Sequence, residues 1–316
     1  TPWTKVSWVG IWSALALVYF GRLGYASFWD PDEATYAAAT REMLQSGSWL
    51  VPLTNGQPFF DKPPLFYVLQ AASFTIWGPS EWAARFVSAA SAVALTGSIA
   101  WAGARLFGSH VGRTAALMFA VLPATLALSF YAIVDMTFTC LLFTGAALAV
   151  IAVTRGPVRL QYYGYAALGA AVLTKGPVAL VLCALALAIA WLITPQVRSE
   201  LRQLRWGIGL MIVLAIASPW FAYMWWRFGD AFVQGYFLNE NLRLFAGTLY
   251  GSQRSRLFYF EVIGVGLLPW TPILLGRLVD AAQGRRLTSN ERLLWAWVLA
   301  VLGFFTFSGF KLDHYV

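Results

Sequence analysis

Charged residues are scarce in this sequence. Asp, Glu, Lys and Arg together make up only 11% of its 316 residues, whereas a soluble globular domain carries about 25%. Hydrophobic residues account for 59%, and the mean hydropathy is +0.64. This shortage of charge excludes an ordinary soluble domain and predicts a membrane protein.

Cysteine is also scarce, with only two in the whole chain. Cys140 and Cys183 lie within separate apolar runs. A buried free cysteine packs as a small hydrophobic residue. We therefore expect packing roles for both residues and no disulfide bond between them.

Long apolar runs are abundant and are separated by short polar segments. Candidates for membrane-spanning helices are 8–26, 84–104, 114–131, 136–153, 161–174, 176–194, 207–226, 258–276 and 293–310. Since a helix needs roughly 20 residues to cross the hydrocarbon core, the sequence predicts an all-α polytopic membrane protein with about nine spans. A further run, 64–78, is short, opens with two prolines and is rich in aromatic residues.

Acidic residues are fewer than basic ones, 14 against 22, and the net charge of +8 is unevenly distributed. If 64–78 does not span, one side of the membrane carries a net charge of +9 and the other −1. Counting 64–78 as a span would instead separate Lys5 from the later arginine clusters. Because positively charged loops stay in the cytoplasm, we expect 64–78 to lie along the membrane surface. The basic excess is then a topology signal and argues against nucleic-acid binding.

The predicted topology gathers unusual polar residues on the extracytoplasmic face. They are Asp32, Glu33, Asp61, Lys62, Asp135, Lys175, Arg227, Glu240, Arg243, Lys311, Asp313, His314 and Tyr315. Ionisable groups at a membrane boundary are costly, so they suggest a functional site. The alternative is that outer loops simply hold whatever polar residues exist. We expect 27–83 to form a first, catalytic loop and 227–257 a second large loop of one domain, 1–316.

Several short motifs occur in an order that resembles one family. They are Asp32-Glu33-x-x-Tyr36, Asp61-Lys62-Pro63-Pro64, Thr174-Lys175-Gly176-Pro177, Glu240-Asn241-x-Arg243-x-Phe245 and Lys311-Leu312-x-x-Tyr315. Together they resemble bacterial GT-C glycosyltransferases of the protein-mannosyltransferase-like group, which includes the lipid A 4-amino-4-deoxy-L-arabinose transferases. Members of that group normally continue beyond the position of Val316, so we expect a C-terminal remainder.

The resemblance implies a GT-C fold in the bacterial inner membrane and a multi-pass enzyme. It implies transfer of a sugar, with inversion, from a polyprenyl-phosphate donor of the undecaprenyl type to an extracytoplasmic lipid, glycan or protein. Lipid A aminoarabinose transfer is the more specific alternative. The leaving group is a phosphate monoester with a second pKa near 6, so it departs without a general acid. The reaction needs a base for the acceptor and cations for the phosphate.

By resemblance, Asp32 is the catalytic residue that binds and deprotonates the acceptor. Its alternative role is a helix N-cap, while Glu33 suits a first-turn charge favoured by the helix dipole. Lys62 is expected to contact the donor phosphate, and Asp61 to orient it or hold a metal. A simple surface ion pair is the alternative for these two residues. Tyr36 and, in addition to its first-turn role, Glu33 are expected to help position donor or acceptor.

Further cations are expected at the donor phosphate: Lys175, Arg243 and Lys311. Arginine offers phosphate a planar fork of donors, whereas a lysine at a helix end, such as Lys175, also suits snorkelling to the interface. The remaining positioning candidates are Asp135, Glu240 and Tyr315, with His314 expected at the surface. A divalent metal would use Asp61 and Glu240, although Asn241 replaces a histidine of the arabinose transferases and weakens a transition-metal site. No other cofactor is implied.

Two other classes stay open at this point. Boundary carboxylates and lysines also suit an ion path through a transporter, but the chain shows no internal repeat and its charges gather at one face. A non-catalytic membrane scaffold would need neither Asp32 nor Lys62. Replacement of Asp32 by alanine distinguishes the enzyme from both.

Overall fold

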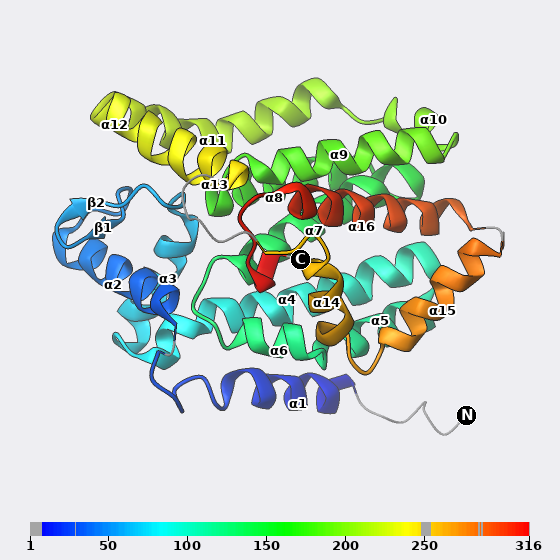
Figure 1. The fold of residues 1–316 in the computed structure, drawn as a ribbon, viewed down its shortest axis with the longest axis horizontal. Helices are drawn as coiled ribbons and strands as arrows, with labels where there is room; N and C mark the ends of the chain where they lie inside the picture. The colour runs from blue at the N-terminus through cyan, green and yellow to red at the C-terminus, as the bar shows by residue number, and fades with distance from the viewer. Residues whose placement is uncertain (1–7, 29, 248–253, 284, 286, 316) are drawn as a thin grey trace.

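The computed structural model describes residues 8–28, 30–247, 254–283, 285 and 287–315. Within this part the chain is mostly helical (Figure 1). The longer helices are α1 (Trp8–Phe20), α2 (Pro31–Ser46), α3 (Leu65–Trp77), α4 (Glu81–Phe107), α5 (Ser109–Ala120), α7 (Asp135–Thr154), α8 (Arg159–Lys175), α9 (Val178–Ile193), α11 (Trp206–Phe228), α14 (Phe258–Gly266), α15 (Thr271–Ala282) and α16 (Ser289–Phe307). Short helical segments are α6 (Pro123–Ser129), α10 (Val197–Leu201), α12 (Asp230–Phe232), α13 (Leu244–Ala246), the π-helix η2 (Val233–Arg243) and the 3-10 helix η3 (Asp313–Tyr315).

Three helices of the described chain, α4, α7 and α11, are long and apolar enough to cross a membrane. A fourth candidate is the pair α5 and α6, which is bent by 62°. Pro123 stands at the first position of α6, where a ring without an N–H begins a helix but does not continue one. The run 114–131 is therefore two helical pieces and not one.

The run 258–276, expected to be a single span, is broken. It divides into α14 and α15, and Pro269 lies in the turn between them. Proline lacks the N–H that would continue the helical ladder and clashes with the preceding turn. The expectation of one continuous helix here is wrong.

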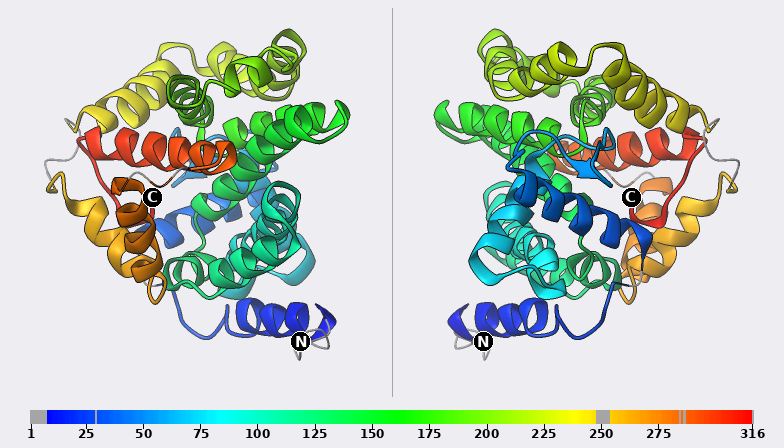
Figure 2. Two further views of the ribbon diagram at one scale, coloured as in Figure 1. Left: turned by 90° about the vertical axis from the view of Figure 1, so that its right-hand side faces the viewer. Right: turned by 90° about the vertical axis from the view of Figure 1, so that its left-hand side faces the viewer.

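The helices pack closely through small residues, as is common in membrane proteins. On α7 and α8, Gly145 and Gly164 face each other. A Cβ on Gly145 would lie 2.9 Å from the Gly164 carbonyl oxygen. Figure 2 shows α1 along one side of the molecule and α11 along the opposite side, with the other long helices between them.

The segment between α1 and α4 contains α2, a small hairpin and α3. The hairpin pairs β1 (Leu53–Thr54) with β2 (Gln57–Pro58) around Asn55 and Gly56, both with positive φ. Asn-Gly is the preferred sequence for such a tight turn, and the Glu42 carboxylate accepts hydrogen bonds from both backbone N–H groups. The all-α expectation is thus correct apart from this hairpin, and 64–78 forms a helix as expected.

Candidate active site

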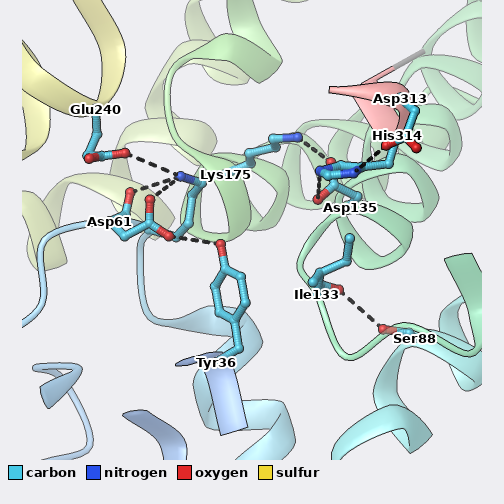
Figure 3. Close-up of polar contacts among 10 residues, drawn as sticks. Tyr36, Asp61, Ser88, Ile133, Asp135, Lys175, Glu240, Asp313 and His314 are labelled. Atoms are coloured by element: carbon cyan, nitrogen blue, oxygen red, sulfur yellow. Dashed lines mark hydrogen bonds and ion pairs between the residues drawn. The ribbon is translucent and has the colours of Figure 1, made fainter. Parts of the chain in front are cut away.

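A partly buried polar cluster joins α2, the loop before α3 and η2. The Lys62 ammonium pairs with the Asp61 carboxylate and lies 3.9 Å from Glu240 Oε2 (Figure 3). The Tyr36 hydroxyl donates to Asp61 Oδ2 at 2.9 Å. Pro63 and Pro64 follow directly and restrict the backbone that presents Asp61 and Lys62.

A second polar cluster joins the start of α7, the end of α8 and η3. The Lys175 ammonium pairs with Asp135 and lies 4.4 Å from the centre of the Tyr315 ring. His314 Nε2 lies 3.9 Å from Asp135 Oδ2. Gly176, with φ +94°, ends α8 directly after Lys175. His314 is therefore largely buried next to Asp135 and is not the surface residue that we expected.

The two clusters meet at a cavity of about 430 Å³. Its polar side is formed by Asp61, Lys62, Lys175 and Glu240. The rest is largely apolar, with Phe237, Phe245, Phe304, Phe305, Phe310 and Tyr315 in its wall. Such a cavity suits an amphipathic ligand with an anionic head and an apolar chain, because the ammonium groups would meet the head and the rings the chain.

Asp32 lies in the exposed first turn of α2. Its side chain makes no hydrogen bond or ion pair within the described chain, in contrast to those of Asp61 and Asp135. Partial desolvation by the surrounding protein, together with the negative charges of Asp30 and Asp61, raises the pKa of Asp32. The N-cap of α2 is Asp30, whose side chain accepts from the Asp32 N–H at 2.7 Å. The capping role considered for Asp32 thus belongs to Asp30.

The pKa values of two carboxyl groups in the first cluster are shifted in opposite directions. Burial alone would raise the pKa of Asp61, but the Lys62 ammonium and hydrogen bonds outweigh it and lower that pKa. Burial raises the pKa of Glu240 to about 7, against the opposing charge of Lys62. The Glu240 carboxyl group is therefore protonated at acidic pH and loses its proton near neutral pH.

Glu33 points away from the cavity into the protein. It is fully buried and binds Arg85 of α4 through both carboxylate oxygens, at 2.9 and 3.0 Å. Glu33 Oε1 also accepts the Ala132 N–H at 2.9 Å. Its observed contacts are those of a structural residue that fixes α2 against α4 and the segment before α7.

Two predicted phosphate ligands do not line the cavity. Arg243 is exposed on η2 and donates to Asn239 Oδ1 at 2.9 Å. Lys311 is buried, and its ammonium donates to the Ser308 carbonyl oxygen at 2.6 Å. The structure thus brings Lys62 and Lys175 to the cavity and leaves these two cations beside it.

Potential metal ligands are few in this region. No group of three or more His, Cys, Asp and Glu residues with suitable spacing occurs among the described residues. Asp61 and Glu240, the expected pair, both lie next to the Lys62 ammonium. A divalent ion at this place would have to compete with that charge.

Sequence reasoning missed three residues. Arg85 was hidden in an apolar run, although a charge within such a run is itself a signal. Tyr67 and Tyr236 are fully buried, and neither hydroxyl has a hydrogen-bond partner within the described chain. Burial and the neighbouring carboxylates, Asp61 first, raise the pKa of Tyr67. Nothing in the sequence distinguishes these tyrosines from other aromatic packing residues.

The fold and the cavity define a class: multi-pass helical membrane proteins with an amphipathic pocket at one end of the helices. The chain belongs to the dolichyl-phosphate-mannose-protein mannosyltransferase family, whose model matches residues 61–225. This membership confirms the resemblance found in the motifs.

Individual relatives extend the match along nearly the whole chain. The undecaprenyl phosphate-alpha-4-amino-4-deoxy-L-arabinose arabinosyl transferase 1 of Sodalis glossinidius is 30% identical over 97% of this chain and 56% of its own length. The corresponding transferase of Aeromonas salmonicida is 30% identical over 95% of this chain and 55% of its own length. The chain therefore spans about half the length of the curated relatives that it matches.

Solved structures agree with this assignment. The crystal structure of ArnT from Cupriavidus metallidurans bound to undecaprenyl phosphate has a TM-score of 0.89 and 27% sequence identity, and the match covers 99% of this chain and 57% of that one. Its apo form has a TM-score of 0.84 at 28% identity, with 98% and 56% covered. The chain thus shares the fold of that transferase over its described length.

Proposed function

We propose that the protein is a membrane glycosyltransferase that moves a sugar from a polyprenyl-phosphate donor to an extracytoplasmic acceptor. The observation that carries this proposal is the cavity with Lys62 and Lys175 at its polar side and phenylalanines around the rest. A polyprenyl phosphate has a matching shape and charge. The relatives whose names include undecaprenyl phosphate, and the solved neighbour bound to it, support the same ligand class.

The donor phosphate would lie between Lys62 and Lys175. Each ammonium already faces a carboxylate, so the pairs hold the lysines in place before the donor arrives. As the bond between the anomeric carbon and the phosphate oxygen breaks, the electron pair passes to the phosphate. The two ammonium groups stabilise this developing charge. Tyr315, stacked on Lys175, and Tyr36, bonded to Asp61, keep these groups oriented.

Asp32 would act on the acceptor. An acceptor hydroxyl attacks the anomeric carbon from the face opposite the phosphate, its proton passes to the Asp32 carboxylate, and the configuration inverts. The raised pKa of Asp32 brings the group closer to the range in which a carboxylate is an effective base. An acceptor that is itself a phosphate would be oriented by Asp32 without proton transfer.

The proposed topology places this site outside the cytoplasm. About nine spans, with 64–78 along the interface, put the arginine-rich loops in the cytoplasm. Segments 27–83 and 227–257 then form the extracytoplasmic loops of an inner-membrane protein. Asp32, Asp61 and Glu240 come from these two segments, which supports a reaction at that face.

A more specific function has support of its own. The Sodalis and Aeromonas relatives carry 4-amino-4-deoxy-L-arabinose in their names. That sugar is therefore the first donor to try, with lipid A as acceptor. By the motif resemblance, the arabinose transferases have Glu at the position of Asp61 and His at the position of Asn241, so the broader assignment stands first and this one second.

The test is sugar transfer by purified protein from a panel of radiolabelled polyprenyl-phosphate sugars to a membrane extract. Wild type, Asp32→Asn and the exposed control Asp230→Asn are compared. We expect transfer from one donor by wild type and control, and a loss of at least about 100-fold in Asp32→Asn, the usual contribution of a general base. Full activity of Asp32→Asn would overturn the mechanism. The absence of transfer and of donor binding in wild type would favour a transporter or scaffold.

A further inference from the structure

A second cavity shares no lining residue with the candidate active site. It has a volume of about 290 Å³ and lies between α7, α8, α9, α11 and α16, with α10 at one end. Figure 1 shows α10 at the end of the molecule opposite to α2 and the hairpin. The volume is close to the lower end of the roughly 300–1,000 Å³ found for small-ligand sites. The proposed transfer reaction uses none of the residues in its wall.

The wall of this cavity is apolar and opens sideways. Leu210, Trp206 and Leu180 line it and are also exposed, at 57%, 51% and 37%. These residues belong to the outer faces of α9 and α11, which a bilayer would cover. An alkyl chain can enter such an opening from the hydrocarbon core, whereas a peptide would bring backbone polar groups that the wall does not satisfy.

One charged side chain lines the cavity among the described residues: Glu200 of α10. The Glu200 carboxylate has no hydrogen-bond or ion-pair partner among the described residues. Desolvation by burial raises its pKa. A half-buried carboxylate at an apolar wall is costly unless a cation pairs with it, and the wall itself supplies none.

The turn that carries Glu200 also carries three arginines. Arg198 donates to the Trp191 carbonyl oxygen at 3.3 Å, and Arg205 donates to the Tyr162 hydroxyl at 2.6 Å. Arg202 is exposed and has no such partner in the described chain. A carboxylate in the cavity and a guanidinium outside it therefore lie two residues apart in sequence, and neither has a partner among the residues that the structure describes.

We propose that this cavity is a binding site for a zwitterionic phospholipid with a primary ammonium headgroup. One acyl chain fills the apolar cavity, the ammonium pairs with Glu200, and the phosphate pairs with Arg202. An anionic phospholipid without an ammonium would face Glu200 with a like charge. A quaternary ammonium has no N–H to donate to that carboxylate.

The test is native mass spectrometry of the delipidated protein in detergent, titrated with phosphatidylethanolamine, phosphatidylcholine or phosphatidylglycerol of identical acyl chains. We expect phosphatidylethanolamine to bind about tenfold more tightly than the other two, the value of one good hydrogen bond to a charged group. Glu200→Gln removes this preference. The control Glu261→Gln, an exposed acidic residue of α14 outside the cavity, keeps it.

A cavity-filling variant tests the acyl chain separately. Leu187 lines the cavity, and Leu187→Trp is expected to reduce the binding of all three lipids. Equal affinity for the three lipids, or an unchanged preference in Glu200→Gln, would overturn the proposal. The same holds if no lipid binds to wild type, which is the result expected if another protein segment occupies the cavity. If Leu187→Trp does not fold, the lipid preference of Glu200→Gln still tests the proposal.

Discussion

Arg85 of α4 and Glu33 of α2 form a two-point ion pair that is almost completely shielded from solvent. The remaining donors of Arg85 reach the carbonyl oxygens of Leu23, Ala26 and Ser27. The Arg85 guanidinium therefore links the segment that precedes α2 to α4. Asp32 directly precedes Glu33, so this contact fixes the helical turn that presents the proposed base.

Loss of this ion pair should destabilise the protein strongly. Removing one partner of a buried pair leaves an uncompensated charge and costs about 3–5 kcal/mol. We expect Arg85→Gln to lower the free energy of unfolding by this amount, measured by thermal unfolding in detergent. The control is Arg277→Gln, since Arg277 pairs with Glu291 at 40% and 29% exposure and should cost at most about 1 kcal/mol. Equal losses in the two variants would contradict the structural role of Glu33.

The pH dependence of transfer should report Asp32. A base acts when it is deprotonated, so kcat/KM falls as the pH drops through its pKa. Because that pKa is raised, the fall should occur above the ordinary range of an aspartate. Asp30 contributes negative charge to the shift, and Asp30→Asn keeps an N-capping side chain. We expect Asp30→Asn to move the acidic limb to lower pH, and an unmoved limb would exclude Asp32 as the titrating base.

The positions of several helices could be predicted from the sequence, whereas the interruptions within two predicted spans could not. Runs such as 136–153 and 207–226 coincide with α7 and α11 because length and hydrophobicity alone define a span. The same criterion ignores Pro123 and Pro269, where the ladder of hydrogen bonds fails. The hairpin was also missed, although its Asn-Gly turn is visible in the sequence.

Part of the cavity lining could be predicted from the sequence, but the pairing of its charged residues could not, and Arg243 and Lys311 do not line the cavity as expected. Topology placed Asp61, Lys62, Asp135 and Lys175 on one face because odd and even loops alternate across a membrane. Which carboxylate meets which ammonium depends on helix rotation and tertiary packing. No local pattern relates Lys175 to Asp135, 40 residues apart.

Glu240 should make donor affinity depend on pH. Its pKa of about 7 means that the neutral acid predominates below that pH and the carboxylate above it. Ionisation adds a second negative charge near Lys62, which then attracts the donor phosphate less strongly. We expect the donor KM to rise several-fold from pH 6 to pH 8 in wild type and to stay nearly constant in Glu240→Gln. Glu261→Gln is the control, and an identical rise in Glu240→Gln would contradict this role.

Gly176 should be indispensable for the position of Lys175. Its φ of +94° is a region that side chains rarely adopt, and a Cβ there would lie 2.1 Å from the Tyr236 hydroxyl oxygen. We expect Gly176→Ala to cost about 1–3 kcal/mol of stability from the backbone alone and to weaken donor binding, because the change displaces either Lys175 or Tyr236.

The double variant Gly176→Ala with Tyr236→Phe separates the two causes. It removes the hydroxyl that collides with the new Cβ and leaves the backbone strain. The Tyr236 hydroxyl has no partner in the described chain, so Tyr236→Phe alone should leave stability unchanged or slightly raised, like the control Tyr165→Phe, whose hydroxyl is also buried and without a partner. We therefore expect the double variant to recover part of the loss in unfolding temperature and donor affinity. If the double variant recovers nothing, the backbone strain of an alanine at position 176 accounts for the whole loss. If Tyr236→Phe by itself weakens donor binding, the Tyr236 hydroxyl contacts the donor.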